Sequence, residues 1–483
     1  MEPAHPTTAP DPRRWQALAL VCVAFFMTVL DVSIVNVALP SIKTSLHVSE
    51  NTLQWVLIAY TITFGGLLLL GGRAADLFGR RRMFMVGMAL FSAASLVCGL
   101  AGSIGVLIAA RAVQGIGAAI ISPATLAIIM TTFEEGSERN KALGVWGAMG
   151  GSGAAAGVLF GGILTKYAGW EWIFFVNVPV GALVLALTRP IVRESRIAGL
   201  RGFDAGGAVT ITSSLALLVY AISKAPQIGW SAAHTIEELI GAAVLFAAFV
   251  VIETRNHSPI VPFGIFRVRT VTGANVCGVF LGAVVFANFF LLTLYVQQVL
   301  HYSALKTGLT FLATAGTVIP VAGLSQALVT RVGVRPVMTV GLALITGGLL
   351  WYTQIPAHGS FATHLLPGYL MMGVGMAFAF IPMSIAALAG VEPDEAGLAS
   401  GLINTSQQIG GALGVAIAAS VAFTHTGTLL ALGHSPAQAQ TSGFALGFWV
   451  LAGIGAASVV ACLALVRGSE LQLTEAGSVT AAL

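Results

Sequence analysis

Two residues of opposite charge, Asp31 and Arg111, stand inside long apolar stretches of the chain. An ionised side chain in lipid is costly unless it is paired, neutralised or facing water. Removal from water favours the neutral acid, whereas a nearby cation favours the carboxylate. A carboxyl group held between these two influences can take up and release a proton as its surroundings change. Proton transfer is therefore the chemistry that this pair of residues could perform.

The sequence predicts that the two residues lie at the same depth. Asp31 stands eight residues before Leu39, at the outer end of its apolar stretch, and Arg111 stands eight residues after Ser103. At about 1.5 Å per helical residue, both lie roughly 12 Å below the same membrane surface. We therefore expect an ion pair. A permanently paired structural Asp and a snorkelling structural Arg remain the alternatives.

Apolar stretches long enough to cross a membrane recur along almost the whole chain. Of its 483 residues, 57% are hydrophobic and 9% are charged, whereas soluble proteins carry roughly a quarter charged residues. The stretches are continuously apolar, without the alternation of barrel strands. The sequence therefore predicts an all-α integral membrane protein with fourteen transmembrane helices. The predicted spans are 16–39, 52–71, 83–102, 105–130, 142–164, 172–190, 204–223, 238–253, 271–299, 306–328, 336–355, 365–388, 398–422 and 443–466.

The distribution of Lys and Arg predicts the orientation of these spans. With both termini in the cytoplasm, 18 of the 23 Lys and Arg residues fall in inner loops. The outer loops hold only Lys43, Lys166, Lys224 and Lys306. This bias is the one that cytoplasmic loops show, and a bacterial inner membrane is the expected location. The net charge of +4 then reflects topology and gives no reason to expect nucleic-acid binding.

Other kinds of site are not expected. The four cysteines all fall within predicted spans, at spacings that suggest neither disulfides nor metal ligands. We expect no cofactor and no resident metal. The chain has no Walker-type Gly-x-x-x-x-Gly-Lys segment and no nucleophile elbow. A membrane-embedded enzyme is the less favoured alternative, because it would need a convergent set of acids, bases or metal ligands.

The sequence predicts a short, polar, arginine-rich loop at residues 72–82, after the second predicted span. It contains Gly72, Asp76, Gly79, Arg80 and Arg81 in the pattern Gly-x-x-x-Asp-x-x-Gly-Arg-Arg. The glycines permit a tight turn. The Asp could accept backbone N–H groups at a helix start, and the arginines could bind helix-end carbonyls or a carboxylate. This pattern resembles the signature of loop 2–3 in the major facilitator superfamily.

A weaker copy of this segment at residues 330–335 aligns with residues 76–81 and keeps a Gly and an Arg. It indicates two six-helix halves in parallel repeat, with two extra helices between them. The predicted domains are an N-terminal bundle (15–193), a two-helix insert (203–254) and a C-terminal bundle (271–467). Fourteen spans resemble the drug:proton antiporter branch of the superfamily. Residues 30–40, 170–181 and 397–405 are similar to motifs of that branch, although Arg is usual where Glu171 stands.

The resemblance implies a major facilitator fold and roles for particular residues. Residues 111–117 resemble the helix 4 motif, whose Arg is linked to proton movement. Gly153, Gly157 and Gly161 recur every fourth residue, and with Gly162 they predict a flat surface for close helix packing. This region resembles the antiporter motif. It departs from that motif in having Val158, rather than proline, after Gly157, which leaves an importer or a uniporter open.

The predicted function is proton-coupled export of small lipophilic molecules such as drugs or antibiotics. An exporter or uniporter of an endogenous metabolite or lipid is the alternative. Beyond Asp31 the sequence suggests no buried anion, which favours neutral or weakly charged substrates. Substrate, protons and lipid are the expected partners of a monomer. Polar residues in the spans could line a substrate cavity or join helices, at about 0.6 kcal/mol each. These candidates are Gln54, Tyr60, Gln114, Asn288, Asn404 and Gln407.

Overall fold

The computed structural model describes residues 12–134, 137–196, 204–256, 259, 261, 263–388 and 396–466, which contain helices and no strand. The first half comprises α1 (Arg14–Leu46), α2 (Glu50–Leu53), α3 (Trp55–Phe78), α4 (Arg80–Gly99), α5 (Ile104–Thr132), α6 (Ser137–Tyr167), α7 (Trp172–Phe175) and α8 (Asn177–Ile191). Two helices follow, α9 (Ala205–Ile228) and α10 (Ala233–Arg255). The second half comprises η1 (Phe263–Arg267), α11 (Arg269–Leu294), η2 (Tyr295–Val299), α12 (Ala304–Val332), α13 (Val334–Tyr352), η3 (Phe361–Leu365), α14 (Leu366–Leu388), α15 (Ala396–Ala431) and α16 (Pro436–Leu465).

Each predicted span coincides with a helix or with two helices in direct succession. In the described part of the chain, thirteen of these helical stretches are long and apolar enough to cross a membrane. The remaining predicted span, 142–164, coincides with α6, a glycine-rich helix of 31 residues. The all-α integral membrane class is therefore confirmed. Most helices extend beyond their apolar spans, because polar residues continue the helix outside the hydrocarbon region.

The expectation of a polar loop at residues 72–82 is wrong for most of its length. The helix α3 continues to Phe78, α4 begins at Arg80, and only Gly79 separates them. Gly79 has φ of +108°, a region that favours glycine. Its N–H donates to the Ala75 carbonyl at 3.1 Å. A single glycine suffices for the turn, and the flanking Ala, Leu and Arg residues have high helix propensity.

The same turn recurs in the second half of the chain. Gly333 has φ of +87° and lies between α12 and α13, and its N–H donates to the Val329 carbonyl at 2.9 Å. This is the position that the weak copy at residues 330–335 predicted. The halves therefore repeat in geometry as well as in hydropathy.

Arginines at the first and third long helices of each half bind the final carbonyls of its last helix. In the first half, Arg13 donates to the Pro190 carbonyl, and Arg81 donates to the Val192 carbonyl at 3.3 Å. The second half repeats this arrangement, with bonds from Arg269 to Ala464 at 3.0 Å and from Arg335 to Leu463 at 2.6 Å. Cations at helix C-termini are stabilising. These contacts relate α1, α4 and α8 to α11, α13 and α16.

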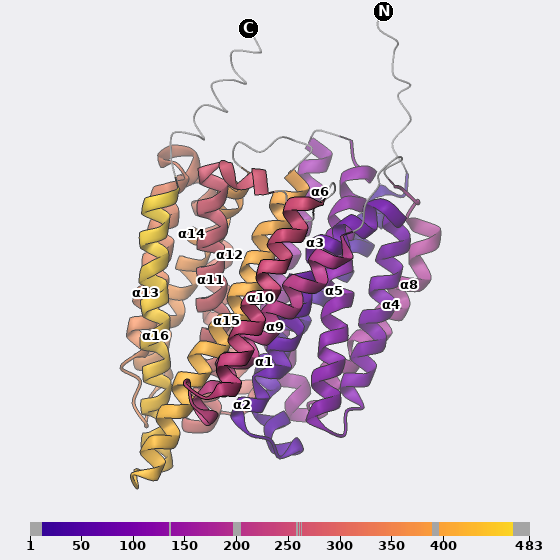
Figure 1. Cartoon of the computed structure of the whole chain (residues 1–483). Coiled ribbons are helices and arrows are strands. Elements are labelled where there is room, and N and C mark those ends of the chain that lie inside the picture. Colours follow the sequence, from indigo (N-terminus) through magenta and orange to yellow (C-terminus); the bar gives the residue numbers. More distant parts are fainter. Residues whose placement is uncertain are drawn as a thin grey trace, which may run out of the picture.

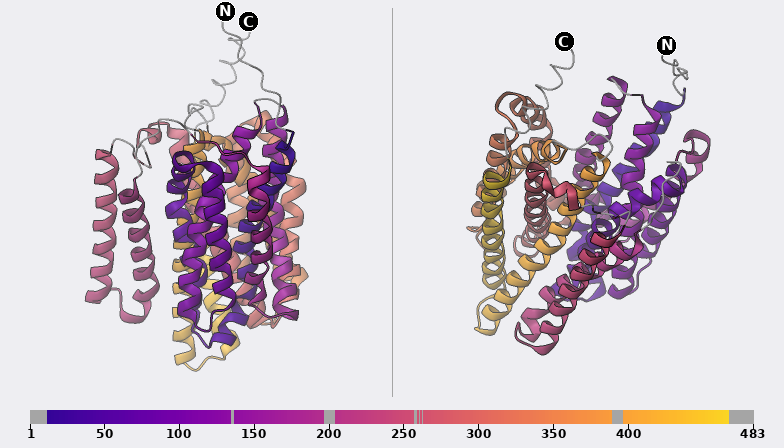
Figure 2. Two further views of the ribbon diagram at one scale, coloured as in Figure 1. Left: turned by 90° about the vertical axis from the view of Figure 1, so that its right-hand side faces the viewer. Right: turned by 45° about the horizontal axis from the view of Figure 1, so that its top comes forward.

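The halves lie side by side as two groups of helices (Figures 1 and 2). Between the groups, α3 packs against α15 and α6 packs against α12. Close approach occurs at glycines. An added Cβ on Gly162 would lie 2.7 Å from the Leu305 Cα, and one on Gly308 would lie 2.6 Å from the Val158 carbonyl oxygen. The first helix begins and the last helix ends at the upper end of the array in Figure 1.

The two inserted helices stand as a pair at the side of the other helices (Figure 2). Of the pair, α9 contacts both halves. The Tyr220 ring lies 5.9 Å from that of Trp55, and Ser420 donates to the Ile222 carbonyl at 3.2 Å. The pair therefore lies along the line where α3 and α15 meet. The predicted domain limits at residues 203 and 467 fall outside the described residues, and the domain boundaries stay a prediction.

Candidate proton-coupling site

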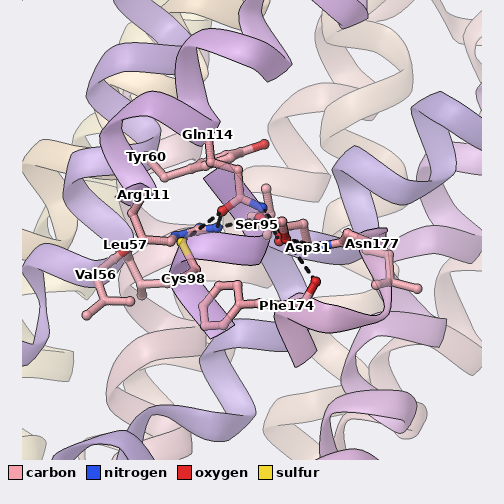
Figure 3. Close-up of polar contacts among 12 residues, drawn as sticks. Asp31, Val56, Leu57, Tyr60, Ser95, Cys98, Arg111, Gln114, Phe174 and Asn177 are labelled. Carbon is pink, nitrogen blue, oxygen red and sulfur yellow. Dashed lines mark hydrogen bonds and ion pairs between the residues drawn. The ribbon is translucent and has the colours of Figure 1, made fainter. Parts of the chain in front are cut away.

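Two unbroken helices position the charged pair found in the sequence. Asp31 lies in the middle of α1, and Arg111 lies two turns into α5. Ser103 caps α5, its side chain accepting from the Val106 N–H at 3.4 Å. This start fixes where Arg111 stands along the helix. Figure 3 shows the two side chains pointing toward each other between the helices.

The Asp31 carboxylate accepts three hydrogen bonds. Its Oδ2 accepts from Arg111 Nη1 at 2.5 Å. Its Oδ1 accepts from Gln114 Nε2 at 2.9 Å and from Asn177 Nδ2 at 3.0 Å. Asp31 and Arg111 are both completely buried, at 0% exposure. A charged pair survives such burial only with good geometry and further hydrogen bonds, and this pair has both.

The Arg111 guanidinium is held on several sides. Its Nε donates to the Val56 carbonyl at 3.0 Å, and Nη1 also donates to Gln114 Oε1 at 2.7 Å. Its central carbon lies 4.3 Å from the centre of the Tyr60 ring and 5.7 Å from that of Phe174. Aromatic faces attract cations, most strongly away from water. The cation therefore keeps several partners even if the bond to Asp31 is lost.

Ser95 of α4 joins the amide side chains of this cluster. Its hydroxyl accepts from Gln114 Nε2 at 3.1 Å and from Asn177 Nδ2 at 3.0 Å, and donates to the Phe174 carbonyl at 2.9 Å. The cluster thus joins α1, α3, α4, α5 and the α7–α8 segment. A proton placed on Asp31 would remove the charge that holds Arg111, so the cluster has two possible bonding states.

The structure brings two of the predicted cavity residues into this cluster. Tyr60 and Gln114 are both completely buried against Asp31 and Arg111. The sequence interpretation left out Ser95 and Asn177. Asn177 lies in the 170–181 motif and could have been found there, whereas Ser95 is one Ser among many and carries no signal.

The other predicted cavity residues lie apart from the cluster. Gln54 is the residue directly before α3, and its side chain donates to the Asn51 carbonyl at 3.0 Å. Asn288 is buried in α11. Asn404 is exposed and donates to the Ser400 carbonyl of its own helix at 2.9 Å, while the Gln407 backbone packs against Gly282.

The arginine-rich segment makes a second polar cluster at the helix ends. Arg80 donates to Asp76 at 2.9 and 3.0 Å. The expectation that Asp76 accepts backbone N–H groups is wrong, because it stands in the last turn of α3. Glu194 takes that role, accepting from the Arg81 N–H at 3.0 Å and the Arg82 N–H at 3.2 Å. Gly72 lies about two helical turns before Gly79 on α3, and an added Cβ there would touch Pro123 at 3.4 Å.

The glycine series of α6 faces α1. An added Cβ would lie 3.1 Å from the Phe26 carbonyl oxygen at Gly153, 2.6 Å from that of Leu30 at Gly157, and 2.8 Å from that of Ile34 at Gly161. Gly162 faces α12 instead. The backbones of α1 and α6 therefore lie in close contact on both sides of Asp31, at Leu30 and at Ile34.

The expectation that Asp31 is the only buried anion is wrong. Asp204, Glu238 and Glu253 are 5%, 7% and 3% exposed. They stand near the ends of the inserted helices, where one carboxylate oxygen of each accepts a hydrogen bond or forms an ion pair. Asp204 accepts from the Gly207 N–H at 2.8 Å, Glu238 pairs with His234 at 2.9 Å, and Glu253 accepts from the Val261 N–H at 3.1 Å. In the described part of the chain, no three His, Cys, Asp or Glu side chains are grouped to hold a metal.

Comparison with known proteins agrees with this architecture. Among curated proteins, the puromycin resistance protein pur8 of Streptomyces alboniger is 40% identical over 433 residues, or 89% of this chain and 86% of that protein. The cephamycin export protein CmcT of Amycolatopsis lactamdurans is 38% identical over 85% of each chain. The lincomycin resistance protein of Streptomyces lincolnensis is 34% identical over 85% of each chain.

Solved structures resemble the fold at low sequence identity. The POT family transporter PepTSo has a TM-score of 0.66 at 15% identity, over 93% of this chain and 98% of its own. The nucleoside transporter NupG has a TM-score of 0.66 at 12% identity, over 93% and 100%. The family model described as Major Facilitator Superfamily matches residues 21–415. This multi-pass membrane protein therefore belongs to the major facilitator superfamily.

Proposed function

We propose that this protein exports small lipophilic molecules, such as antibiotics, from a bacterial cell in exchange for protons. Relatives that share most of their length with it are named for resistance to puromycin and lincomycin and for export of cephamycin. The protein acts as a monomer in the inner membrane, with both termini in the cytoplasm. Its partners are the substrate, protons and lipid.

The observation that carries proton coupling is the buried carboxylate of Asp31, bonded to Arg111, Gln114 and Asn177. Protonation of this carboxyl would neutralise it and release Arg111 to its remaining partners. Because these partners belong to different helices, the change would alter how α1 packs against α5 and α8. A proton and a substrate could then favour opposite conformations of the same bundle.

The test uses the purified chain in liposomes with an imposed pH gradient. Puromycin and lincomycin serve as probes, chosen after a susceptibility panel in cells with and without the expressed protein. Addition of an exported probe should move protons in the wild type, and Asp31→Asn should reduce this movement to that of protein-free liposomes. Wild-type proton movement by Asp31→Asn would remove Asp31 from the mechanism.

The alternative is a uniporter or exporter of an endogenous metabolite or lipid. A uniporter is supported by Val158, which stands where the antiporter motif has proline, so that α6 contains no proline. The same liposomes distinguish a uniporter from a proton antiporter, and the susceptibility panel distinguishes a drug substrate from an endogenous one. A uniporter would move its substrate without moving protons, and Asp31→Asn would then leave transport at the wild-type rate.

A further inference from the structure

Ser95 is completely buried between two amide side chains and one backbone carbonyl of the candidate proton-coupling site (Figure 3). Its hydroxyl contacts the Phe174 carbonyl at 2.9 Å, Gln114 Nε2 at 3.1 Å and Asn177 Nδ2 at 3.0 Å. A hydroxyl has one hydrogen to donate and two lone pairs that accept. Because a carbonyl oxygen can only accept, the one hydrogen of Ser95 is donated to Phe174. The hydroxyl oxygen therefore accepts from both amides, and each amide must present an N–H group to it.

This polarity fixes how the two amides face Asp31. An amide nitrogen carries two hydrogens, so each amide also has one for the carboxylate. Gln114 Nε2 donates to Asp31 Oδ1 at 2.9 Å, and Asn177 Nδ2 donates to the same oxygen at 3.0 Å. With Arg111 on Oδ2, the carboxylate is bound by three donors. Donors stabilise the ionised form, whereas the O–H of a protonated carboxyl group needs an acceptor.

The two amides differ in how firmly their orientation is held. The other end of the Gln114 amide is engaged, because Oε1 accepts from Arg111 Nη1 at 2.7 Å. Asn177 is 1% exposed, and its Oδ1 has no hydrogen-bond partner among the described residues. The orientation of Asn177 therefore depends on its bonds to Asp31 and Ser95. Turning the amide costs less for Asn177 than for Gln114, which would lose its bond to Arg111.

Phe174 links this orientation to the α7–α8 segment. It belongs to the four-residue helix α7, Val176 separates α7 from α8, and Asn177 is the first residue of α8. A movement of α7 that withdrew the Phe174 carbonyl would free the hydrogen of Ser95. That hydrogen could then be donated to Asn177 Oδ1, whose second lone pair would accept the O–H of Asp31.

We propose that Ser95 is a positioning residue of the proton-coupling site, whose bond to the Phe174 carbonyl holds both amides as donors and keeps Asp31 ionised until α7 moves. This inference rests on the proposed function. The incoming proton binds Asp31 Oδ1, and the new O–H donates to Asn177 Oδ1 after the amide has turned. Oδ2 keeps Arg111 as its donor, in a weaker bond because the acceptor is now neutral.

Other groups around the carboxylate also affect its protonation. Among the described residues, the charged and titratable groups that face Asp31 are Arg111 of α5, Tyr60 of α3 and Cys98 of α4. The face of α6 against α1 is formed by glycines, and α8 contributes a neutral amide. All of these groups stay in the variants below, so a change in the protonation of Asp31 reports the hydrogen bonds of Ser95.

The experiment measures the protonation of Asp31 by infrared spectroscopy of the purified full chain in liposomes, without substrate, over a series of pH values. A protonated carboxyl group has a carbonyl stretching band that a carboxylate lacks, and the contribution of Asp31 is the part absent from Asp31→Asn. The test variants are Ser95→Ala, which removes the acceptor, and Ser95→Cys, which fills the same space with a weak acceptor. Gel filtration checks that each variant is folded.

The matched control is Ser92→Ala, about one turn before Ser95 on the same helix. Ser92 is also buried against α8, where an added Cβ on Gly181 would lie 1.8 Å from its Oγ. Its hydroxyl contacts Met88 Sδ at 3.9 Å. The control therefore removes a buried hydroxyl between the same two helices without changing the bonds of the amides.

We expect the Asp31 band of Ser95→Ala to persist to a pH about 0.5–1 unit higher than in the wild type, the shift that one hydrogen bond of ordinary strength produces. Ser95→Cys should shift in the same direction by less, and Ser92→Ala should match the wild type. A purely structural role of Ser95 would reduce folding or transport without moving this titration. If Ser95→Ala does not fold, Ser95→Cys decides.

The proposal is overturned if the band of the folded Ser95 variants follows that of the wild type or moves to lower pH, or if Ser92→Ala shifts it as much. Proton movement with an exported probe is measured separately in the same liposomes. A wild type that exports the probe without moving protons would refute the proposed function, whereas an unshifted band in the Ser95 variants would refute only the role of Ser95.

Discussion

The two carboxylate oxygens of Asp31 accept hydrogen bonds from three side chains. These bonds determine what a substitution of Asp31 or of Arg111 should do. Loss of one partner from a buried ion pair leaves an uncompensated charge, a penalty of about 3–5 kcal/mol. Protonation avoids that penalty. The two single variants should therefore differ, because one removes the proton site and the other removes its counter-charge.

Arg111→Ala should keep Asp31 protonated and stall proton release, whereas Asp31→Asn should retain downhill exchange and substrate binding in part. The double variant should be no worse than Asp31→Asn alone, because the two residues act as one unit. Counterflow and uphill transport in liposomes measure both properties. Additive losses in the double variant would show that the residues act separately.

Tyr60 contributes its ring rather than its hydroxyl. Its Oη is buried and has no hydrogen-bond partner among the described residues, while its ring lies over Arg111. Tyr60→Phe should therefore keep transport within about twofold of wild type. Tyr60→Leu should lose a cation–π contact of about 0.5–2 kcal/mol and transport more slowly. Equal losses in both variants would assign the role to the hydroxyl.

At this scale the sequence could place the charged pair, because helical rise converts residue spacing into depth. It could not place Ser95, whose importance comes from which helices meet around it. It also missed the burial of Glu238 and Glu253, because a hydropathy pattern treats acids near helix ends as exposed, whereas these two pack against the protein and accept from His234 and from the Val261 N–H.

Helix contacts repeat between the halves at the scale of elements. Gly157 and Gly161 of α6 approach carbonyls of α1, and Gly410 and Gly414 of α15 approach carbonyls of α11 in the same way. The sequence indicated the first series through its four-residue spacing. The second became evident only from the packing, although it has the same spacing.

Gly157→Ala tests this close packing. The added Cβ would lie 1.9 Å from Ser33 Oγ and 2.6 Å from the Leu30 carbonyl oxygen, and that backbone oxygen cannot move without separating α1 from α6. Overpacking of this kind destabilises by about 1–3 kcal/mol. Thermal unfolding in detergent should show a lower Tm, while Gly427→Ala, with open space around it, serves as the control. Equal Tm values would mean that α6 can shift freely.

The α3–α4 turn should affect transport rather than assembly. Asp76→Asn or Arg80→Ala removes a pair between adjacent helix ends, and so should change the balance between conformations. We expect normal amounts of protein in the membrane with at least severalfold slower efflux of the probe. Full efflux by both variants would reduce this segment to a signal for orientation.

For the whole molecule, hydropathy and charge predicted the helix succession, because each helix must satisfy its backbone within lipid. They could not predict where the inserted pair would lie. That position depends on side-chain contacts such as Trp55 with Tyr220, which only packing creates. The pair connects the two halves in the chain, so the number of times it crosses the membrane decides the orientation of the second half.

Reporter fusions test this arrangement across the whole chain. An inserted pair that crosses the membrane twice returns the chain to its starting side. Fusions after Arg201 and after Arg269 should therefore both report the cytoplasm, and one after Lys224 should report the outside. In the structure, Arg81 and Arg335 bind the final helix of their respective halves in the same way. Two halves in parallel repeat need these arginines on one side of the membrane. If the fusions after Arg201 and Arg269 lie on opposite sides, the inserted helices do not form a crossing pair and the halves are inverted instead.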